Sequence, residues 1–104
     1  MSNEIMNPEE LEYTEISPTE SVATIETDIC EMKVFRFKAG FSSPRHTHSD
    51  SNIKFVLKGK ILVNGEKEVV AGAKYACGDI YYFDVPEDTY LLVLQKPGTK
   101  RVDA

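Results

Sequence analysis

The sequence is short of the residues that many common sites require. Its 104 residues include only two histidines and two cysteines, and Cys30 and Cys77 lack the C-x2-C spacing of a structural zinc site. A site with three histidine ligands is therefore excluded. We expect both cysteines to be reduced thiols in the core, although their positions leave a disulfide between them possible.

Long hydrophobic runs are also missing. No apolar stretch approaches the roughly 20 residues that a membrane-spanning helix needs. The N-terminal residues MSNEIMNPEE lack the basic patch and apolar core of a secretory signal. We therefore expect a cytoplasmic protein, and the length is typical of one globular domain.

Positive charge is absent from the first third of the chain. Residues 1–31 contain nine acids and no lysine or arginine, whereas the remainder contains eight acids and all twelve basic residues. This acidic segment argues against nucleic-acid binding, and the scattered lysines of the remainder favour no phosphate-binding face. We predict a polar acidic arm over residues 1–18, with either a short helix or a loose tail at Pro8, and one domain over residues 19–104.

Most of the chain has the pattern of short strands separated by glycine, proline and asparagine. The predicted strands cover residues 21–25, 31–38, 80–85 and 90–95, with a hairpin over residues 61–70. Asn64-Gly65 suits a two-residue turn in that hairpin, because both residues tolerate positive φ. Short strands at this spacing predict an all-β sandwich or barrel.

The most informative stretch runs from Gly40 to Gly59, GFSSPRHTHSDSNIKFVLKG. Residues two apart in a strand share a face, so His46 and His48 would point to the same side, about 6.5 Å apart along the backbone. Two imidazoles at this separation can bind one transition-metal ion. The pair can also be an ordinary His-Thr-His sequence in an exposed polar loop.

The spacing of this stretch resembles the first sequence motif of the cupin superfamily, G-x5-H-x-H-x3/4-E-x6-G. Gly40, His46, His48 and Gly59 match the motif, and Asn52 stands where the family usually has a glutamate ligand. The resemblance covers most of residues 30–98.

The second cupin motif, G-x5-P-x-G-x2-H-x3-N, is degenerate in this chain. Its best counterpart begins at Gly72, lacks the proline, and has Tyr81 where the third histidine would be. The motif is therefore matched mainly by its glycines and by the closing strand.

The resemblance implies a single antiparallel β-barrel or jelly roll of the cupin type, and a homodimer. It also implies a divalent transition metal (Fe, Mn, Ni, Zn or Cu) held by His46, His48 and Asn52, with waters, Tyr81 or substrate completing the coordination. The chemistry would then be dioxygenation, isomerisation or decarboxylation of a small organic molecule.

The neighbouring polar residues have alternative roles. Asn52 is a neutral and therefore poorer ligand than a carboxylate, and it can equally be a structural hydrogen-bonding residue. Lys54 shares the parity of Asn52 and would suit an anionic substrate group if it were buried, but we favour its exposure to water. Tyr81 could contact substrate or a ferric ion, but we favour a ring packed in the core with its hydroxyl bonded to the backbone.

Three functions remain compatible with the sequence. The chain could be a metal-dependent enzyme, a module that binds or senses a small ligand, or a barrel that has lost its site and serves in dimerisation or interaction. The last hypothesis predicts a mouth blocked by large side chains. No nucleophile elbow, phosphate loop or dinucleotide glycine signature is present, and a fold alone does not decide among the three.

Overall fold

The structure is a computed structural model that describes residues 7–75 and 78–103. Every strand pair in this part of the chain is antiparallel, which confirms the predicted all-β class. The sole helical segment among the described residues is the 3-10 turn η1 (Pro8–Glu10), so the structure selects the short helix over the loose tail. No helix within the described ranges is long and apolar enough to cross a membrane.

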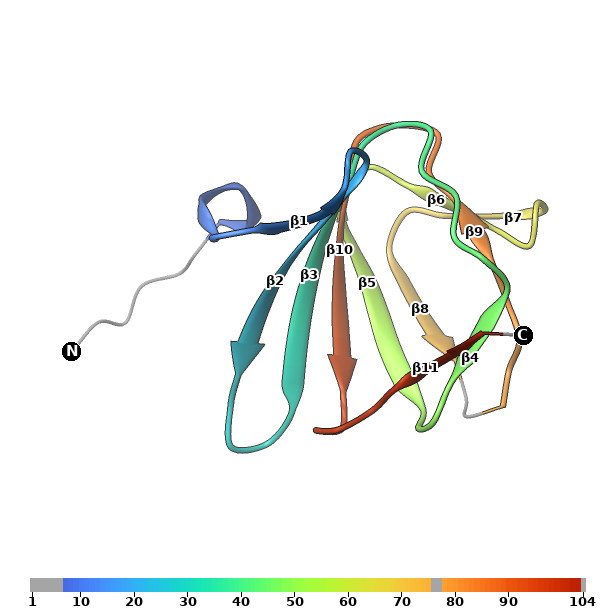
Figure 1. Cartoon of the computed structure of the whole chain (residues 1–104). Helices are drawn as coiled ribbons and strands as arrows, with labels where there is room; N and C mark the ends of the chain where they lie inside the picture. Colours follow the sequence, from blue (N-terminus) through green and yellow to red (C-terminus); the bar gives the residue numbers. More distant parts are fainter. Residues whose placement is uncertain (1–6, 76–77, 104) are drawn as a thin grey trace.

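One layer of the molecule is a six-stranded sheet with β10 near its centre (Figure 1). The order is β1 (Thr14–Ser17), β2 (Glu20–Glu26), β3 (Glu31–Phe37), β10 (Thr89–Gln95), β5 (Asn52–Lys58) and β8 (Gly72–Tyr75). The strand β10 pairs with β3 on one side and with β5 on the other, so segments far apart in the sequence form the middle of the sheet.

Two smaller sheets form the opposite side of the molecule. One pairs β4 (His46–His48) with β11 (Arg101–Asp103), and the other has the order β7 (Lys67–Val69), β6 (Ile61–Val63) and β9 (Phe83–Asp84). The strand predicted over residues 80–85 is therefore shorter than expected. Tyr81 instead forms an isolated bridge with His46, with two backbone hydrogen bonds of 2.9 and 3.0 Å, before the chain joins β6.

The predicted hairpin is present between β6 and β7, but its loop has three residues. Val63 pairs with Lys67, which leaves Asn64, Gly65 and Glu66 in the loop. The φ angles of 52° at Asn64 and 72° at Gly65 explain why this dipeptide occurs here. The Glu66 N–H donates a hydrogen bond to the Val63 carbonyl and closes the loop. The loop is therefore one residue longer than the predicted two-residue turn.

The hydrophobic core lies between the layers. It consists of Phe37, Ile61, Val63, Val69, Tyr81, Phe83, Val85, Leu91 and Val93. In β10, Leu91 and Val93 are buried whereas Leu92 between them is half-buried, as expected for a strand with one face toward the core. Complete burial of each large apolar side chain contributes about 1.5–3 kcal/mol.

Part of the polar segment expected over residues 1–18 forms β1, which pairs with β2 at the edge of the large sheet. Cys30 is a free, half-buried thiol in the connection between β2 and β3. The expectation for Cys77 concerns a residue outside the described ranges.

Gly59 ends β5 at a point where two segments come very close together. Its φ of +90° is in the left-handed region, and a Cβ at this position would clash with Thr89 Oγ1 and the Asp88 carbonyl. The Thr89 hydroxyl cannot move away easily, because it accepts a hydrogen bond from the Lys60 N–H at 3.2 Å. Glycine is therefore needed here for both its backbone conformation and its lack of a side chain.

We expect Gly59→Ala to destabilise the protein by about 2–4 kcal/mol, because backbone strain and a steric clash add. Urea unfolding followed by circular dichroism measures the loss. Gly98→Ala is the matched control, because Gly98 has a φ of +84° with no atom within 4 Å of an added Cβ. Its cost should be only the strain of about 1–2 kcal/mol. Equal losses in the two variants would show that the close approach at Gly59 has no effect.

Candidate functional site

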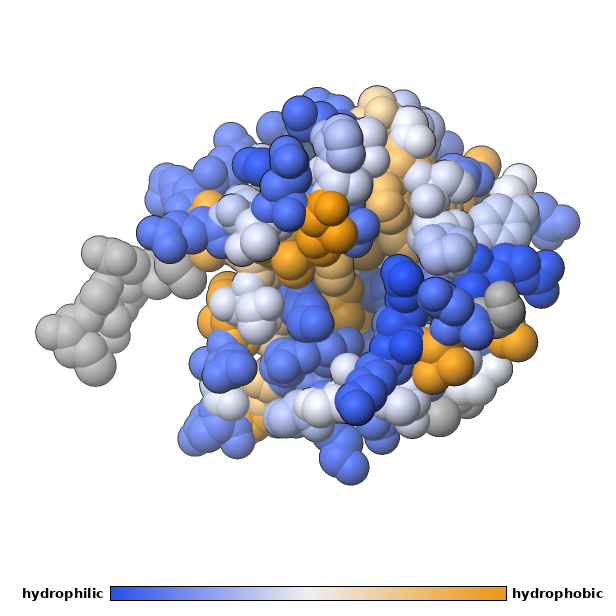
Figure 2. All heavy atoms as spheres, in the orientation of Figure 1, coloured by the Kyte–Doolittle hydropathy of each residue, from blue (hydrophilic) through white to orange (hydrophobic). Residues whose placement is uncertain are grey.

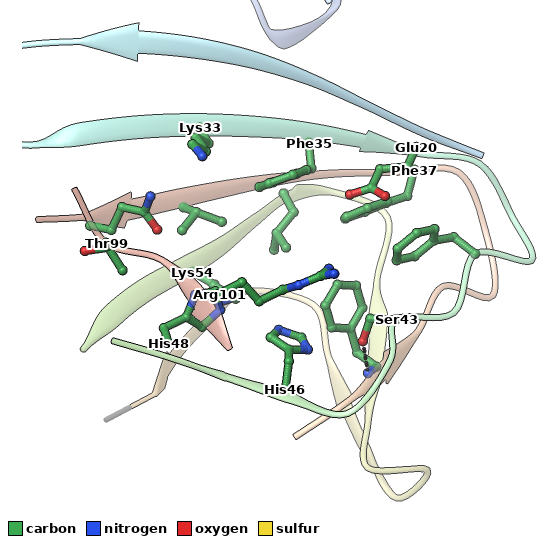
Figure 3. A pocket seen from close by; sticks show the side chains of 15 residues that line it. Glu20, Lys33, Phe35, Phe37, Ser43, His46, His48, Lys54, Thr99 and Arg101 are labelled. Atoms are coloured by element: carbon green, nitrogen blue, oxygen red, sulfur yellow. Dashed lines mark hydrogen bonds between the residues drawn. The ribbon is translucent and has the colours of Figure 1, made fainter. Parts of the chain in front are cut away.

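A cavity of about 130 Å³ lies between the large sheet and the β4–β11 pair. Its apolar wall is formed by Phe35, Phe37, Phe41, Phe83, Leu91 and Val93, and its polar lining includes His46, His48 and Lys54. Figure 2 shows a hollow at the centre of this face, with hydrophobic atoms inside it. In Figure 3 the histidines and Lys54 lie on one side of the cavity, with Phe35 and Phe37 on the other.

His46 and His48 point to the same side of β4 and both line the cavity. The exposed fraction of His46 is 4%, His48 is half-buried, and the two ring centroids are 5.1 Å apart. The predicted shared face is therefore observed, and the alternative of an exposed His-Thr-His loop is wrong. The pairing of β4 with β11 holds this short strand in place.

The hydrogen bond of His46 determines its tautomer. Its Nδ1 lies 2.7 Å from the Pro44 carbonyl oxygen, which can only accept, so Nδ1 carries the proton and donates it. The lone pair of a neutral His46 is then on Nε2. Burial lowers the pKa of His46 from 6.5, which favours this neutral form.

Lys54 is buried, with an exposed fraction of 4%, so the favoured expectation of exposure is wrong. The irregularity in the pairing of β5 with β10 lies beyond Val56, and the alternation from Asn52 to Lys54 is therefore uninterrupted. The Lys54 Nζ donates to Asn52 Oδ1 at 2.7 Å and to the Tyr81 hydroxyl at 2.6 Å. The side chain of Asn52, which has an exposed fraction of 2%, is thus oriented by its hydrogen bond from Lys54.

Tyr81 connects Lys54 to the histidines. Its ring is packed in the core as expected, with an exposed fraction of 2%. Its hydroxyl, for which we expected a backbone partner, bonds to the side chains of Lys54 and of His48, whose Nε2 is 3.0 Å away. Because Lys54 donates to Tyr81, the phenolic O–H is available to donate to His48 Nε2.

The charges in this cluster follow from its burial. Burial lowers the pKa of Lys54 to about 7. Burial, together with the neighbouring Lys54 ammonium, lowers the pKa of His48 to about 4. His48 is therefore a neutral imidazole near pH 7, whereas Lys54 is only partly protonated there and is the cationic member of the cluster below that pH.

Two of the three predicted metal ligands are engaged in hydrogen bonds in this arrangement. In residues 7–75 and 78–103, no three His, Cys, Asp or Glu side chains are grouped so that they could hold one. The Nε2 of His48 and the Oδ1 of Asn52 already accept hydrogen bonds from Tyr81 and Lys54. An ammonium group in this position would also repel a divalent cation. Metal ligation by His46, His48 and Asn52 therefore remains a prediction from the motif.

The cavity contains charged residues that the sequence reasoning missed. Arg101 lies opposite His48 in the β11–β4 pair, and Figure 3 shows its side chain extending across the cavity near His46. Lys33 and Glu20 also line the cavity. The parity of Lys33 with the neighbouring phenylalanines of its strand is a signal that could have found it, but the pairing of residues 101–103 with β4 has no local signature.

We expect the stability of the wild-type protein to rise with pH between about pH 7 and pH 9 because of Lys54. Its pKa falls from 10.5 in the unfolded chain to about 7 in the fold, so the unfolded chain binds more protons in this window. The rise for one proton is at most about 1.4 kcal/mol per pH unit. Urea unfolding should show this slope in the wild type and in Lys58→Met, and a reduced slope in Lys54→Met. Identical slopes in all three proteins would contradict the assignment.

The sequence matches no protein-family model and no curated protein. Comparison of the structure with solved structures, in contrast, finds clear similarity. An RmlC-like cupin protein from Ralstonia eutropha JMP134 superposes with a TM-score of 0.74 at 13% identity, covering 99% of this chain and 74% of that one.

Two further structures have larger chains. A chain in the complex of Rhodobacter sphaeroides SigE with the anti-sigma ChrR gives a TM-score of 0.75 at 14% identity, covering 85% of this chain and 51% of that one. Salicylate 1,2-dioxygenase from Pseudoaminobacter salicylatoxidans, solved with gentisate, gives 0.70 at 12% identity, covering 84% and 30%. This chain thus spans less than two thirds of either protein chain. The described part of the chain has the cupin fold.

Proposed function

We propose that this chain is a cupin-fold module that binds a small organic molecule in the cavity between the large sheet and the β4–β11 pair. The observation that supports this most directly is the combination of an apolar wall with a few polar side chains at one side of the same cavity. Cavities of this composition are typical of small-molecule sites, because apolar walls supply affinity and the polar groups fix orientation.

The aromatic wall favours a ligand with a flat apolar part. Phe35 and Phe37 have ring centroids 5.6 Å apart with their planes inclined by only 3°. Phe37 and Phe41 are also stacked, with centroids 4.3 Å apart. Such rings bury a large area, and their faces and edges pack well against another planar group.

The comparison with salicylate 1,2-dioxygenase supports a small ligand, because that protein was solved with gentisate. This similarity does not support the same activity for this chain, because this chain spans only 30% of that protein chain. The alternative of a barrel without a site predicts a blocked interior, and the open cavity argues against it.

A metal-dependent enzyme is the second candidate, and one contact of His46 favours it. Histidines that bind metals usually donate their other ring N–H to a carbonyl or carboxylate, as His46 does to Pro44. His46 and His48 would hold the ion, which would supply Lewis-acid or oxygen-activating chemistry for dioxygenation, isomerisation or decarboxylation. This function requires His48 and Asn52 to give up their present hydrogen bonds.

We expect Val93→Phe to abolish small-molecule binding, because Val93 is buried and lines the cavity. Leu92→Phe is the matched control, since Leu92 is the preceding residue of β10 and lies on the other face. Ligand-observed NMR with a library of small aromatic and aliphatic compounds measures binding to each protein. Circular dichroism verifies that both variants fold. Binding that survives equally in both variants would place the ligand elsewhere.

The same measurement with a chelator separates the two candidates. A metal-independent module should bind its compounds equally well after chelation, and elemental analysis should find no stoichiometric metal. If the enzyme candidate is correct, metal should be present in the wild type and lost in the His46→Ala/His48→Ala double variant.

We also propose a second copy of the chain as a partner, bound to the outer face of the large sheet. Ile53, Phe55 and Leu57 have exposed fractions of 39%, 40% and 43%, all on the outer face of β5. Leu92 and Leu94 of β10 pair with Phe55 and Ile53, which widens this apolar strip.

An exposed strip of this kind is typical of a protein interface. Sedimentation should therefore detect a species of twice the 11.7 kDa chain mass. Phe55→Lys should dissociate it, whereas Ile16→Lys on the distant strand β1 should not. A wild-type monomer at high concentration would contradict the dimer.

A further inference from the structure

We propose that Glu20 and Arg101 are two opposite charges of the cavity that together bind a small zwitterion. The guanidinium group of Arg101 takes the carboxylate of the ligand, and the carboxylate of Glu20 takes its ammonium group. The ligand class is then a compact amino acid with an apolar side chain. This inference rests on the proposed function, because it names the ligand class of the same cavity.

Glu20 and Arg101 reach the cavity from different sheets. Glu20 is the first residue of β2 and pairs in register with Phe37, so both side chains lie on the inner face of the large sheet and line the cavity. Arg101 is the first residue of β11, which pairs with β4, and it lines the same cavity. Figure 3 shows its guanidinium group between His46 on one side and Glu20 and Phe37 on the other. The two charges therefore face one cavity from opposite layers of the molecule.

The two charges influence each other without forming an ion pair. Burial raises the pKa of Glu20, and the positive charge of Arg101 opposes that rise, so the groups lie within electrostatic range. Within the described ranges, neither an ion pair nor a hydrogen bond joins the two side chains, and the Glu20 carboxylate has no other such partner. A half-buried carboxylate without a partner is costly. A bound ammonium group would offset that cost.

The guanidinium group of Arg101 can bind a carboxylate while it keeps its present partner. Its Nε lies 3.0 Å from a carboxylate oxygen of Asp103, which is two residues further along β11 and shares its face. This contact uses the Nε side of the group and leaves the edge formed by its two terminal nitrogens. That edge matches a carboxylate through two parallel hydrogen bonds.

The other charged groups of the cavity wall are already engaged. Lys33 lies 3.8 Å from the Glu31 carboxylate, and Lys54 donates hydrogen bonds within its own cluster. Glu20 is the acidic residue on the described wall of the cavity. An ammonium group in the cavity is therefore directed to Glu20. A ligand with a carboxylate alone would leave the Glu20 charge without a partner.

The apolar wall and the volume define the rest of the ligand. The stacked rings of Phe35 and Phe37 favour a flat apolar side chain, and the volume of about 130 Å³ limits the ligand to a compact one. L-Phenylglycine has this form and serves as the probe. Phenylacetate is the same molecule without the ammonium group, and benzylamine is the same molecule without the carboxylate.

The test measures the binding of the three probes by isothermal titration calorimetry with a chelator present, at about pH 7, which is above the usual pKa of a glutamate and below that of an amine. The wild type should bind phenylglycine about tenfold more tightly than either analogue, because one charge-assisted contact contributes about this factor. Water screens the Arg101 contact, since that side chain is 49% exposed, so a much larger factor is not expected.

The two variants should have different effects on the analogues. Glu20→Gln should weaken phenylglycine about tenfold and should not weaken phenylacetate, which has no group for Glu20. Arg101→Gln should weaken phenylglycine and phenylacetate by the same factor and should not weaken benzylamine. Loss of the fold would weaken all three probes alike, so this pattern is specific to the proposed contacts.

The matched controls are Glu26→Gln and Arg45→Gln, which change the net charge in the same way. Glu26 lies on the same strand as Glu20, and both control side chains are exposed and lie outside the cavity lining. Both variants should bind all three probes like the wild type. In the wild type, the 13C NMR signal of the Glu20 carboxyl carbon should shift more with phenylglycine than with phenylacetate, and this measurement needs no variant.

The outcomes separate this inference from the function beneath it. Phenylglycine that binds no more tightly than its analogues, or an equal loss of phenylglycine and phenylacetate in Glu20→Gln, would overturn the zwitterion while the cavity still binds other compounds of the library. If no compound of the library binds the wild type and Val93→Phe has no effect, the proposed function fails as well.

Discussion

The burial of one lysine is the constraint on which the polar side of the cavity depends. Taking an ammonium group out of water costs several kcal/mol. The hydrogen bonds from Lys54 to Asn52 and Tyr81 offset part of this cost. Because Tyr81 also bonds to His48, the position of Lys54 influences side chains on three separate segments. Tyr81 belongs to the hydrophobic core, so this polar cluster is held by apolar packing on the other side of its ring.

The strand β5 connects the polar side of the cavity to an irregular part of the sheet. At its start, uninterrupted alternation directs Asn52 and Lys54 inward. Toward its end, the pairing with β10 shifts between Val56 and Lys58, and Gly59 then packs against Thr89. An irregularity before Lys54 would have turned its side chain outward, because a shift of one residue exchanges the two faces of a strand.

Local patterns in the sequence were sufficient for the strands β2, β3, β6 and β10 and for the shared face of His46 and His48, but not for β1, β8 or β11. They were not sufficient for Lys54, because its direction depends on where the irregularity in β5 falls, and composition does not show this. The role of Arg101 was missed for another reason. It reaches the cavity because residues 101–103 pair with residues 46–48, and such long-range pairing is decided by the packing of the whole fold.

A cation that belongs to the chain gives the site different properties from one that binds reversibly. An ammonium group supplies charge and hydrogen bonds, but it has no coordination positions to exchange. Lys54 therefore supplies hydrogen bonds to Asn52 and Tyr81 and offers no position for an exchangeable ligand. His46 lines the same cavity, and its protonated Nδ1 leaves the lone pair on Nε2. A neutral imidazole in this tautomer can accept a proton at Nε2 from a group in the cavity.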